Sequence, residues 1–270
     1  MTLRFSPGLQ NAVAADSSWR HCLAEGSIEI YSGSQPATAD LAVTGTLLAT
    51  ITSSAGTKTN ETRATGVVTL SVGATGTDTL ETLKLLGVDL LGGAVAFDTS
   101  LTVTAAAAAL KINRNPKNHF VIATSSVAVI TLTAKPGFGA LLNSAALATT
   151  VGGNMVAAVT STSFGSGTGG SVAGISAVNG LKLDYNAAAG VITKDTTQTW
   201  SGTAVATGTA GWFRYKGAVV DAGALDSSAV FLRMDGSIAT SGADLNMSST
   251  VVTSGALQTI STFSFTVPAA

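Results

Sequence analysis

Few residues in this chain are of the types that perform acid-base or nucleophilic catalysis. The histidines and glutamates are His21, His119, Glu25, Glu29, Glu61 and Glu81. No Gly-x-Ser-x-Gly motif offers a nucleophilic serine to either histidine. Glu29 alternates with two isoleucines, so we expect its side chain on a solvated strand face. A glycosidase needs two carboxyls held about 5–10 Å apart across a cleft, and the sequence selects no such pair. We predict that the protein is not an enzyme.

One glycine-rich segment matches a nucleotide-binding pattern. Residues Gly165–Gly170, GSGTGG, satisfy Gly-x-Gly-x-x-Gly. That fingerprint also requires a following helix and an acidic residue about 20 positions later. The next residues, SVAGISAVNGLKLD, favour a strand or a loop, and Asp184 comes too early. We therefore predict a flexible linker here, and no cofactor.

A second segment offers oxygen ligands for a hard cation. In RMDGSIATSGADLN, the residues Asp235, Asp244 and Asn246 lie among glycines, and calcium prefers such oxygens. The segment lacks the spaced Asp-x-Asp-x-Asp-Gly loop of calcium-binding proteins. We predict instead that Asp235-Gly236 forms a hairpin turn and that Asp244 starts another turn. No metal is predicted.

The aromatic segment GWFRYKG could contact sugar, nucleic acid or another protein. Alternation with a period of two places Trp212, Arg214 and Lys216 on one strand face, and Phe213 with Tyr215 on the other. We expect one face in the core and the other towards solvent or a neighbouring subunit. Trp212, Arg214 and Tyr215 are therefore candidate interface residues.

The composition favours an assembled protein over a free monomer. Among 270 residues, 11% are charged, 46% are hydrophobic, and the net charge is -1. A typical soluble domain carries about 25% charged residues, so Ser, Thr, Asn and Gly must form much of this surface. Such weakly polar faces are suited to contact with copies or partners. Acidic and basic residues nearly cancel, so we predict no nucleic-acid partner.

Other features bear on the compartment. The lone Cys22 excludes an internal disulfide and is expected as a small buried hydrophobe. The uncharged stretch between Lys135 and Lys182 is interrupted repeatedly by Gly, Ser, Thr and Asn, so we predict no membrane helix. The N-terminal segment lacks the continuous apolar core of a signal peptide. We expect synthesis in a cytoplasm.

The elements that must position these residues are mainly strands. Runs rich in Val, Ile, Thr, Phe and Tyr, bounded by turn residues, predict a mainly β protein. These runs are SIEIYSG, GTLLATITSS, GVVTLSVG, HFVIATSS, VAVITLTAKPG, GWFRYKG, SAVFLRMDG and ISTFSFTVP.

Two helices are expected. The first spans Pro7–Glu25, with Ser6 as its cap. The second spans Thr102–Asn113, with Thr102 or Thr104 as its cap and a stop at Asn115-Pro116.

The order of these elements predicts one domain inserted into another. From about Thr65 to Val151 the order is strand, hairpin, helix, strand, strand, which can close a small α+β core. The flanking segments, SSAGTKTNETRAT and TSTSFGSGTGGSVAG, have the composition of linkers. We predict a β-sandwich-like base domain with an N-terminal helix, formed by residues 1–55 and 180–270. Residues 56–179 would be an inserted α+β domain of β-β-α-β-β order with its linkers.

Several segments resemble a known family. LRFSPGLQNAV, GSIEIYSGSQPATADLAVTGTLLATIT, WSGTAVATGTAGWFRYKG and RMDGSIATSGADLNMSSTVVTSGALQTISTFSFTVP look like poorly characterised structural proteins of tailed bacteriophages. Those proteins begin with a short helix, continue into a strand that ends in Tyr-Ser-Gly, and finish with Gly-Trp-Phe-Arg and Asp-Gly-Ser stretches. The resemblance covers both flanks. The intervening GVVTLSVG and VAVITLTAKPGFGALLN segments are similar to small β-β-α-β-β domains of tail and sheath proteins.

The resemblance implies a virion component without catalytic residues. Its partners would be copies of itself and other virion proteins, with no nucleic acid and no membrane. The similarity to tail modules favours the tail, the neck or fibre attachment. Two alternatives stay open: a capsid decoration protein that cements the head, and a host-receptor or glycan-binding fibre module whose sensor is the inserted domain.

Overall fold

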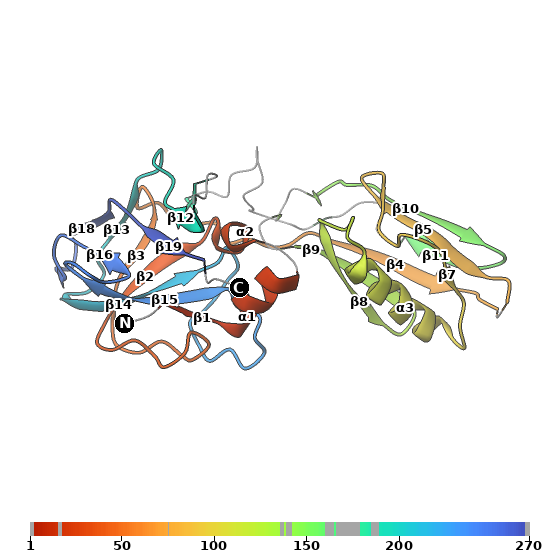
Figure 1. Ribbon diagram of the computed structural model, residues 1–270, viewed down its shortest axis with the longest axis horizontal. Helices are drawn as coiled ribbons and strands as arrows, with labels where there is room; N and C mark the ends of the chain where they lie inside the picture. Colours follow the sequence, from red (N-terminus) through yellow and green to blue (C-terminus); the bar gives the residue numbers. More distant parts are fainter. Residues whose placement is uncertain are drawn as a thin grey trace. The chain divides into compact units, whose positions relative to one another are not determined.

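The chain divides into two compact units (Figure 1). The computed structural model describes residues 3–15, 18–74, 76–135, 138, 142–159, 165, 179–184 and 189–267. The protein is mainly β and its sheets are antiparallel, apart from one short parallel pair, β15 with β16. The first unit comprises Met1–Glu61 and Gly169–Ala270, and the second comprises Thr62–Thr168. Each unit has its own hydrophobic core.

The first unit is built on a nine-stranded sheet. The order of its strands is β1-β15-β14-β2-β3-β13-β18, with β16 paired to β15 and β17 paired to β14, while β12 and β19 form a separate pair. Its helices are α1 (Pro7–Ala15) and α2 (Trp19–Leu23). Its strands are β1 (Arg4–Phe5), β2 (Ser27–Ser32), β3 (Leu47–Ser53), β12 (Val191–Thr193), β13 (Trp200–Thr203), β14 (Gly208–Lys216), β15 (Arg233–Ala239), β16 (Leu245–Asn246), β17 (Val251–Val252), β18 (Leu257–Ile260) and β19 (Ser264–Thr266).

The single helix predicted over Pro7–Glu25 is two helices. Ser6 caps α1 as predicted, because its hydroxyl accepts a hydrogen bond from the Leu9 N–H at 3.2 Å. Ser18 then caps α2, and its hydroxyl accepts from the His21 N–H at 3.3 Å. The spacing of the apolar residues is the same for one helix or two, so it does not reveal the second cap at Ser18. Among the described residues, no helix is long and apolar enough to cross a membrane.

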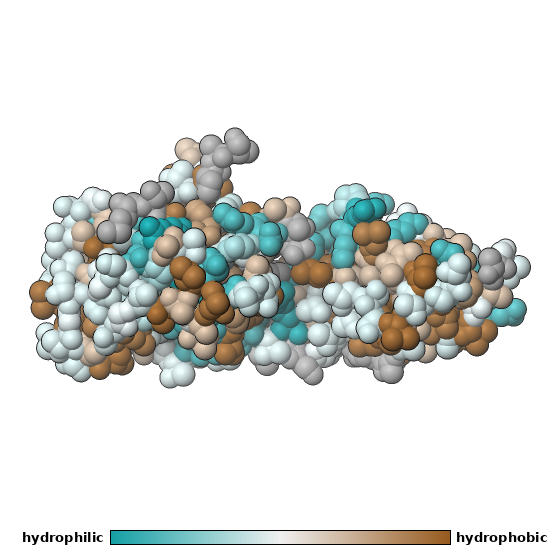
Figure 2. All heavy atoms as spheres, turned by 90° about the horizontal axis from the view of Figure 1, so that it is seen from below, coloured by the Kyte–Doolittle hydropathy of each residue, from teal (hydrophilic) through white to brown (hydrophobic). Residues whose placement is uncertain are grey.

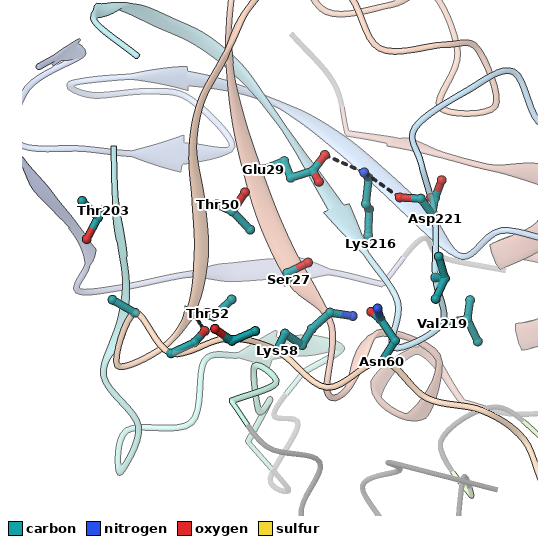
Figure 3. Close-up of a pocket in the computed structure, with 14 residues that line it drawn as sticks. Ser27, Glu29, Thr50, Thr52, Lys58, Asn60, Thr203, Lys216, Val219 and Asp221 are labelled. Carbon is teal, nitrogen blue, oxygen red and sulfur yellow. Dashed lines mark hydrogen bonds and ion pairs between the residues drawn. The ribbon is translucent and has the colours of Figure 1, made fainter. Parts of the chain in front are cut away.

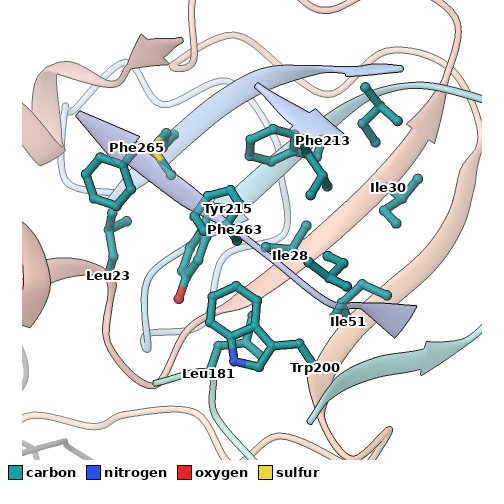
Figure 4. Close-up of a cluster of buried hydrophobic side chains, with 14 of the residues drawn as sticks. Leu23, Ile28, Ile30, Ile51, Leu181, Trp200, Phe213, Tyr215, Phe263 and Phe265 are labelled. Carbon is teal, nitrogen blue, oxygen red and sulfur yellow. The ribbon is translucent and has the colours of Figure 1, made fainter. Parts of the chain in front are cut away.

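An aromatic cluster fills the core of the first unit (Figure 4). Phe263 lies at its centre, with ring centroids 5.6 Å from Trp200, 5.8 Å from Phe213, 6.0 Å from Tyr215 and 6.2 Å from Phe265. Isoleucines of β2 and β3 pack beside these rings. Rings at these separations and tilts add to the stabilisation from burial.

The second unit contains two four-stranded sheets and one helix. One sheet has the order β10-β5-β6, with β7 also paired to β5, and the other has the order β11-β4-β9-β8. Its strands are β4 (Thr65–Ser71), β5 (Thr79–Leu85), β6 (Val88–Asp89), β7 (Val95–Ala96), β8 (Val121–Ser126), β9 (Val129–Ala134), β10 (Leu147–Gly152) and β11 (Val156–Val159). Helix α3 (Leu101–Arg114) packs against β8 and β9.

The second unit is larger than the predicted β-β-α-β-β order. Strand β5 is a full strand that contributes Leu80, Leu83 and Leu85 to the core. Strands β10 and β11 were not predicted, because their Ala, Thr and Gly residues give only a weak strand pattern. The cap of α3 is Ser100, whose hydroxyl accepts from the Val103 N–H at 3.2 Å, and not Thr102 or Thr104.

The first predicted linker is a packed segment of the first unit. The ammonium group of Lys58 donates to the carbonyl oxygens of Gly217 and Ala218 at 3.4 and 3.2 Å. The Glu61 N–H donates to the Ala218 carbonyl at 2.7 Å, and the Glu61 side chain is buried. The second predicted linker, residues 160–174, lies outside the described residues apart from Gly165.

Candidate functional site

The nine-stranded sheet buries two faces of opposite chemistry. On β14, Phe213 and Tyr215 enter the aromatic core, and Trp212, Arg214 and Lys216 lie on the other face, as the alternation predicts. The neighbouring strands β2, β3 and β15 contribute further polar side chains to that second face, which we call the polar face. These side chains are Ser27, Glu29, Tyr31, Thr50, Thr52, Arg233, Asp235 and Ser237.

A buried ion pair lies at the centre of the polar face. Arg214 and Asp235 are cross-strand partners in the register of β14 and β15. The Arg214 Nε and Nη2 atoms donate to the two Asp235 carboxylate oxygens, each at 2.7 Å, and both side chains are fully buried. Burial raises the pKa of Asp235, and the bidentate guanidinium opposes that rise. The remaining Arg214 amino group donates to the Leu41 carbonyl at 3.0 Å.

A second ion pair fastens a loop to the same face. The Arg233 Nε and Nη2 atoms donate to the two carboxylate oxygens of Asp221 at 2.6 Å each. Burial alone would raise the pKa of Asp221, but hydrogen bonds from Arg233 and from the Gly223 N–H outweigh it and leave the pKa below its ordinary value. The Arg233 Nη1 atom also donates to the Asp40 carbonyl at 3.2 Å.

Two loops cover these pairs. They comprise residues 33–46 and residues 217–232, and they bond to each other through Val43 N–H to Gly223 carbonyl at 2.9 Å and Asp226 N–H to Asp40 carbonyl at 2.8 Å. The arginines are satisfied by carboxylates and loop carbonyls together. The two loops close this part of the polar face, so its charged groups stabilise the fold.

The polar face opens at one end into a pocket (Figure 3). The pocket has a volume of about 470 Å³ and lies over β2 and β3, beside the segments 55–60 and 219–221. We call it the β2–β3 pocket. Its polar side chains belong to Ser27, Glu29, Thr50, Thr52, Thr57, Lys58, Asn60, Thr203, Lys216 and Asp221.

Lys216 and Glu29 form one wall of this pocket and point towards each other (Figure 3). The Lys216 ammonium lies 2.6 Å from the Glu29 Oε2 atom and donates to the Asp221 carbonyl at 3.0 Å. Tyr31 donates its hydroxyl hydrogen to the same Oε2 atom at 2.5 Å. Burial, and then the nearby charge of Lys216, lower the pKa of Lys58 to about 8.

A buried carboxyl without a hydrogen-bond partner lies on the aromatic side. Glu25 is 1% exposed, and within the described residues neither of its carboxylate oxygens nor the Tyr215 hydroxyl makes a hydrogen bond. A Cβ on Gly180 would come within 2.5 Å of the Glu25 Cα atom and 2.7 Å of the Glu25 carbonyl oxygen, so the Glu25 backbone requires glycine at 180. Burial raises the pKa of Glu25 to about 7, against the opposing charges of Lys182 and Lys58.

The candidate interface residues lie inside the first unit. Trp212, Arg214 and Tyr215 are each 0% exposed. Trp212 stacks on Tyr31 with ring centroids 4.7 Å apart, and Arg214 pairs with Asp235. The three side chains therefore form no exposed contact surface on this chain, because both faces of β14 are covered.

The turn predicted at Asp235-Gly236 is wrong. Both residues lie within β15, and a Cβ at Gly236 would come within 2.5 Å of the Phe213 ring. A larger residue at position 236 would clash with that ring.

The candidate cation ligands bond to their own neighbours. Asp244 accepts from the Ser237 N–H and hydroxyl at 2.8 and 2.7 Å, and Asn246 Oδ1 accepts from the Ala243 N–H. Among the described residues, no three His, Cys, Asp or Glu side chains are grouped as metal ligands.

The remaining sequence candidates are not brought together. His21 lies in the first unit beside Arg20, and exposed His119 lies in the second unit beside Phe120. Of the glycine-rich motif, only Gly165 is described, and it pairs with Thr65. The other residues of that motif lie outside the described residues. Cys22 is buried, as predicted.

The β2–β3 pocket was not predicted from the sequence. A signal for it exists: Ser27 and Glu29 alternate with the isoleucines of β2, and Thr50 with Thr52 mark one face of β3. The alternation around Glu29 predicts only a solvated strand face. Comparison with family models, with curated proteins and with solved structures finds no match. We therefore interpret the site from its own residues.

Proposed function

We propose that the protein is a non-enzymatic structural component of a bacteriophage virion, in the tail or neck or as a fibre-attachment component. The sequence resemblance described above motivates the proposal. Its partners would be copies of itself and other virion proteins, and neither nucleic acid nor membrane. It would be synthesised in the host cytoplasm and kept in the particle.

The observation that carries the proposal is where the charges lie. The buried charged residues are Glu25, Glu61, Asp78, Lys135, Arg214, Lys216, Asp226, Arg233 and Asp235. Because charged residues are buried here in about the same proportion as other residues, the outer surface is no richer in charge than the 11% composition. In Figure 2, residues of intermediate hydropathy and scattered hydrophobic ones cover much of the face shown. A surface of this kind favours many modest contacts repeated by symmetry.

An exposed apolar group gives the proposal a specific contact surface. Val251 and Leu257 are exposed on β17 and β18, and Val205 is exposed beside them after β13. These segments adjoin, because β13 pairs with β18 and the Gly255 N–H donates to the Ala204 carbonyl at 2.8 Å. We propose this surface as a contact with a neighbouring virion subunit.

In this proposal the two units have different tasks. Residues 1–61 and 169–270 would form a β-sandwich-like base that carries the assembly contacts. Residues 62–168, with their own core, would be an inserted module of the kind that decorates tail proteins. Insertion between neighbouring strands of a base domain is tolerated because the base core stays intact.

The first experiment asks whether the chain belongs to particles. Virions purified by density gradient are analysed by mass spectrometry, and a reconstruction then locates the protein. We expect a stoichiometric component of the tail or neck. Density on the head surface would support the alternative, a capsid decoration protein. Absence of the chain from purified virions would refute the structural proposal.

The second experiment tests the contact surface. The variants Val251→Lys and Leu257→Lys add a charge that a buried contact cannot accommodate, so we expect loss of incorporation into particles. Val127→Lys is the matched control, because Val127 is an exposed valine in a turn of the second unit. Normal incorporation of the Val251→Lys and Leu257→Lys variants would remove this surface from the proposal.

A further inference from the structure

The β2–β3 pocket has the composition of a ligand site and takes no part in the proposed assembly contacts. Its volume of about 470 Å³ falls within the roughly 300–1,000 Å³ of small-molecule sites. All of its lining residues belong to the first unit. The pocket is therefore a property of one compact body.

The pocket holds a carboxylate whose orientation is fixed. Tyr31 and Lys216 both bond to the Glu29 Oε2 atom, at 2.5 and 2.6 Å. Within the described residues, the Glu29 Oε1 atom accepts no hydrogen bond, and Glu29 lines the pocket. A carboxylate oxygen held in this way is a strong acceptor for a ligand hydroxyl.

Other groups offer complementary bonds around the same space. The hydroxyls of Ser27 and Thr50 make no hydrogen bond to any described residue, and each can donate or accept. The Lys58 ammonium is held by two long bonds to the carbonyls of Gly217 and Ala218, and it retains donor capacity. Val219 and Val220 add apolar surface to the wall.

The charged side chains of the pocket are arranged so that neither sign dominates, and this selects the ligand class. Lys216 pairs with Glu29, Asp221 pairs with Arg233, and Lys58 is bonded only to backbone carbonyls. A cation would meet the Lys58 ammonium and an anion would meet the Glu29 carboxylate, so a ligand with one strong charge of either sign is opposed by one of them. A neutral molecule with several hydroxyls, each both donor and acceptor, matches the mixture of acceptor, ammonium and hydroxyls.

We propose that the β2–β3 pocket binds a neutral saccharide unit, with Glu29 Oε1 accepting from sugar hydroxyls and Lys58 donating to one. The apolar side chains of Val219 and Val220 would contact the C–H groups of the ring. This site lies on the first unit, whereas the sequence alternative placed a glycan sensor on the inserted domain. The inference does not depend on the location of the protein in a particle.

The test titrates the full-length purified protein with glucose, galactose, N-acetylglucosamine, maltose and lactose at millimolar concentrations. Binding is followed by saturation-transfer NMR and by amide shifts. We expect millimolar binding of at least one sugar, with amide shifts at Ser27, Glu29, Thr50 and Lys58. Glu29→Gln should weaken it at least about tenfold, the effect of losing a charged hydrogen bond.

Two further variants distinguish the loss of a ligand contact from a loss of folding. Thr50→Val keeps the Glu29–Lys216 pair and the side-chain shape but removes a lining hydroxyl, so we expect a weaker, several-fold loss. Glu81→Gln is the matched control, because Glu81 is an exposed carboxylate of the second unit, and it should leave binding unchanged. Circular dichroism verifies that each variant is folded.

Three outcomes would overturn the inference. These are absence of binding by every sugar, sugar binding that a folded Glu29→Gln variant leaves unchanged, and binding of acetate or phosphate in the pocket without any sugar. None of them bears on whether the chain is found in virions.

Discussion

The two faces of the nine-stranded sheet are both buried, but opposite interactions stabilise them. The aromatic face packs Phe263 against four rings, and its stability is a sum of many small contacts. The polar face depends on Arg214, Arg233 and their carboxylates under two loops. A packed apolar face loses stability gradually when it is trimmed, whereas a buried ion pair fails when one partner is lost.

The comparison can be tested on the first unit alone. All the tryptophans of the chain, Trp19, Trp200 and Trp212, lie in that unit. Their fluorescence therefore reports unfolding of the first unit without a contribution from the second. Each free energy below is that of unfolding in urea, measured in this way.

The largest effect is expected at the centre of the polar face. Asp235→Ala leaves the Arg214 guanidinium buried without a carboxylate, and we expect a loss of about 3–5 kcal/mol. The double variant Arg214→Met with Asp235→Leu removes both charges and should recover most of that loss. A loss below about 1 kcal/mol, the value of a surface pair, would show that the polar face is not dominated by this pair.

The next effect depends on pH and belongs to the aromatic face. The pKa of Glu25 is about 7 in the folded protein, against an ordinary value of 4.5. Between these two pH values the folded protein keeps a proton on Glu25 that the unfolded chain releases. Ionisation of Glu25 should therefore lower the free energy of unfolding as the pH rises from 4.5 to 7, and this effect should then level off. The total change is about 3 kcal/mol.

Glu25→Gln should remove this pH dependence and raise the stability at alkaline pH. Glu81→Gln serves as the control, because that carboxylate is exposed in the second unit. A wild-type profile that rises between mildly acidic and neutral pH would contradict the raised pKa of Glu25.

A smaller, graded effect is expected for trimming the aromatic core. Phe213→Leu keeps an apolar side chain but opens space beside Phe263 and Gly236. We expect a loss of about 1–2 kcal/mol, because neighbouring rings can fill part of the space. A loss as large as that of Asp235→Ala would erase the difference between the two faces.

The smallest effect is expected where the polar face opens. The side chains of Lys216 and Glu29 are 7% and 16% exposed, so solvent in the pocket can replace their bond in part. Lys216→Met should cost about 1 kcal/mol, and added salt should reduce the difference between variant and wild type. A loss that does not change with salt would show that this pair behaves like the buried pairs of Arg214 and Arg233.

The sequence predicted the positions of strands better than it predicted the contacts that their side chains make. The runs around Ile28, Thr50, Val68 and Phe213 became β2, β3, β4 and β14, because alternation and turn residues are local properties. Asp235-Gly236 was assigned to a turn, since the need of the Phe213 ring for glycine is a contact between strands. The short strands β10 and β11 were missed because their residues have weak preferences.

The candidate site was recovered only in part. The alternation on β14 correctly separated Arg214 from Tyr215, but it did not show that a second layer covers the arginine. The glutamate of β2 was assigned to a solvated face, whereas Lys216 from the neighbouring strand makes it a wall of the pocket. The composition around Lys58 predicts a linker, and only the contacts of Lys58 with Gly217 and Ala218 place it over the sheet.

The sequence by itself determined that this protein is mainly β, poor in charge, and composed of alternating strands with caps such as Ser6. These properties follow from composition and from side-chain periods within a single segment. Only the tertiary structure decided that Arg214, Lys216 and Arg233 are buried in ion pairs and that β2 and β3 form the base of a pocket. It also decided that Glu25 is buried with no hydrogen-bond partner among the described residues. Each of these depends on the register between strands far apart in the chain, and a local pattern does not encode that register.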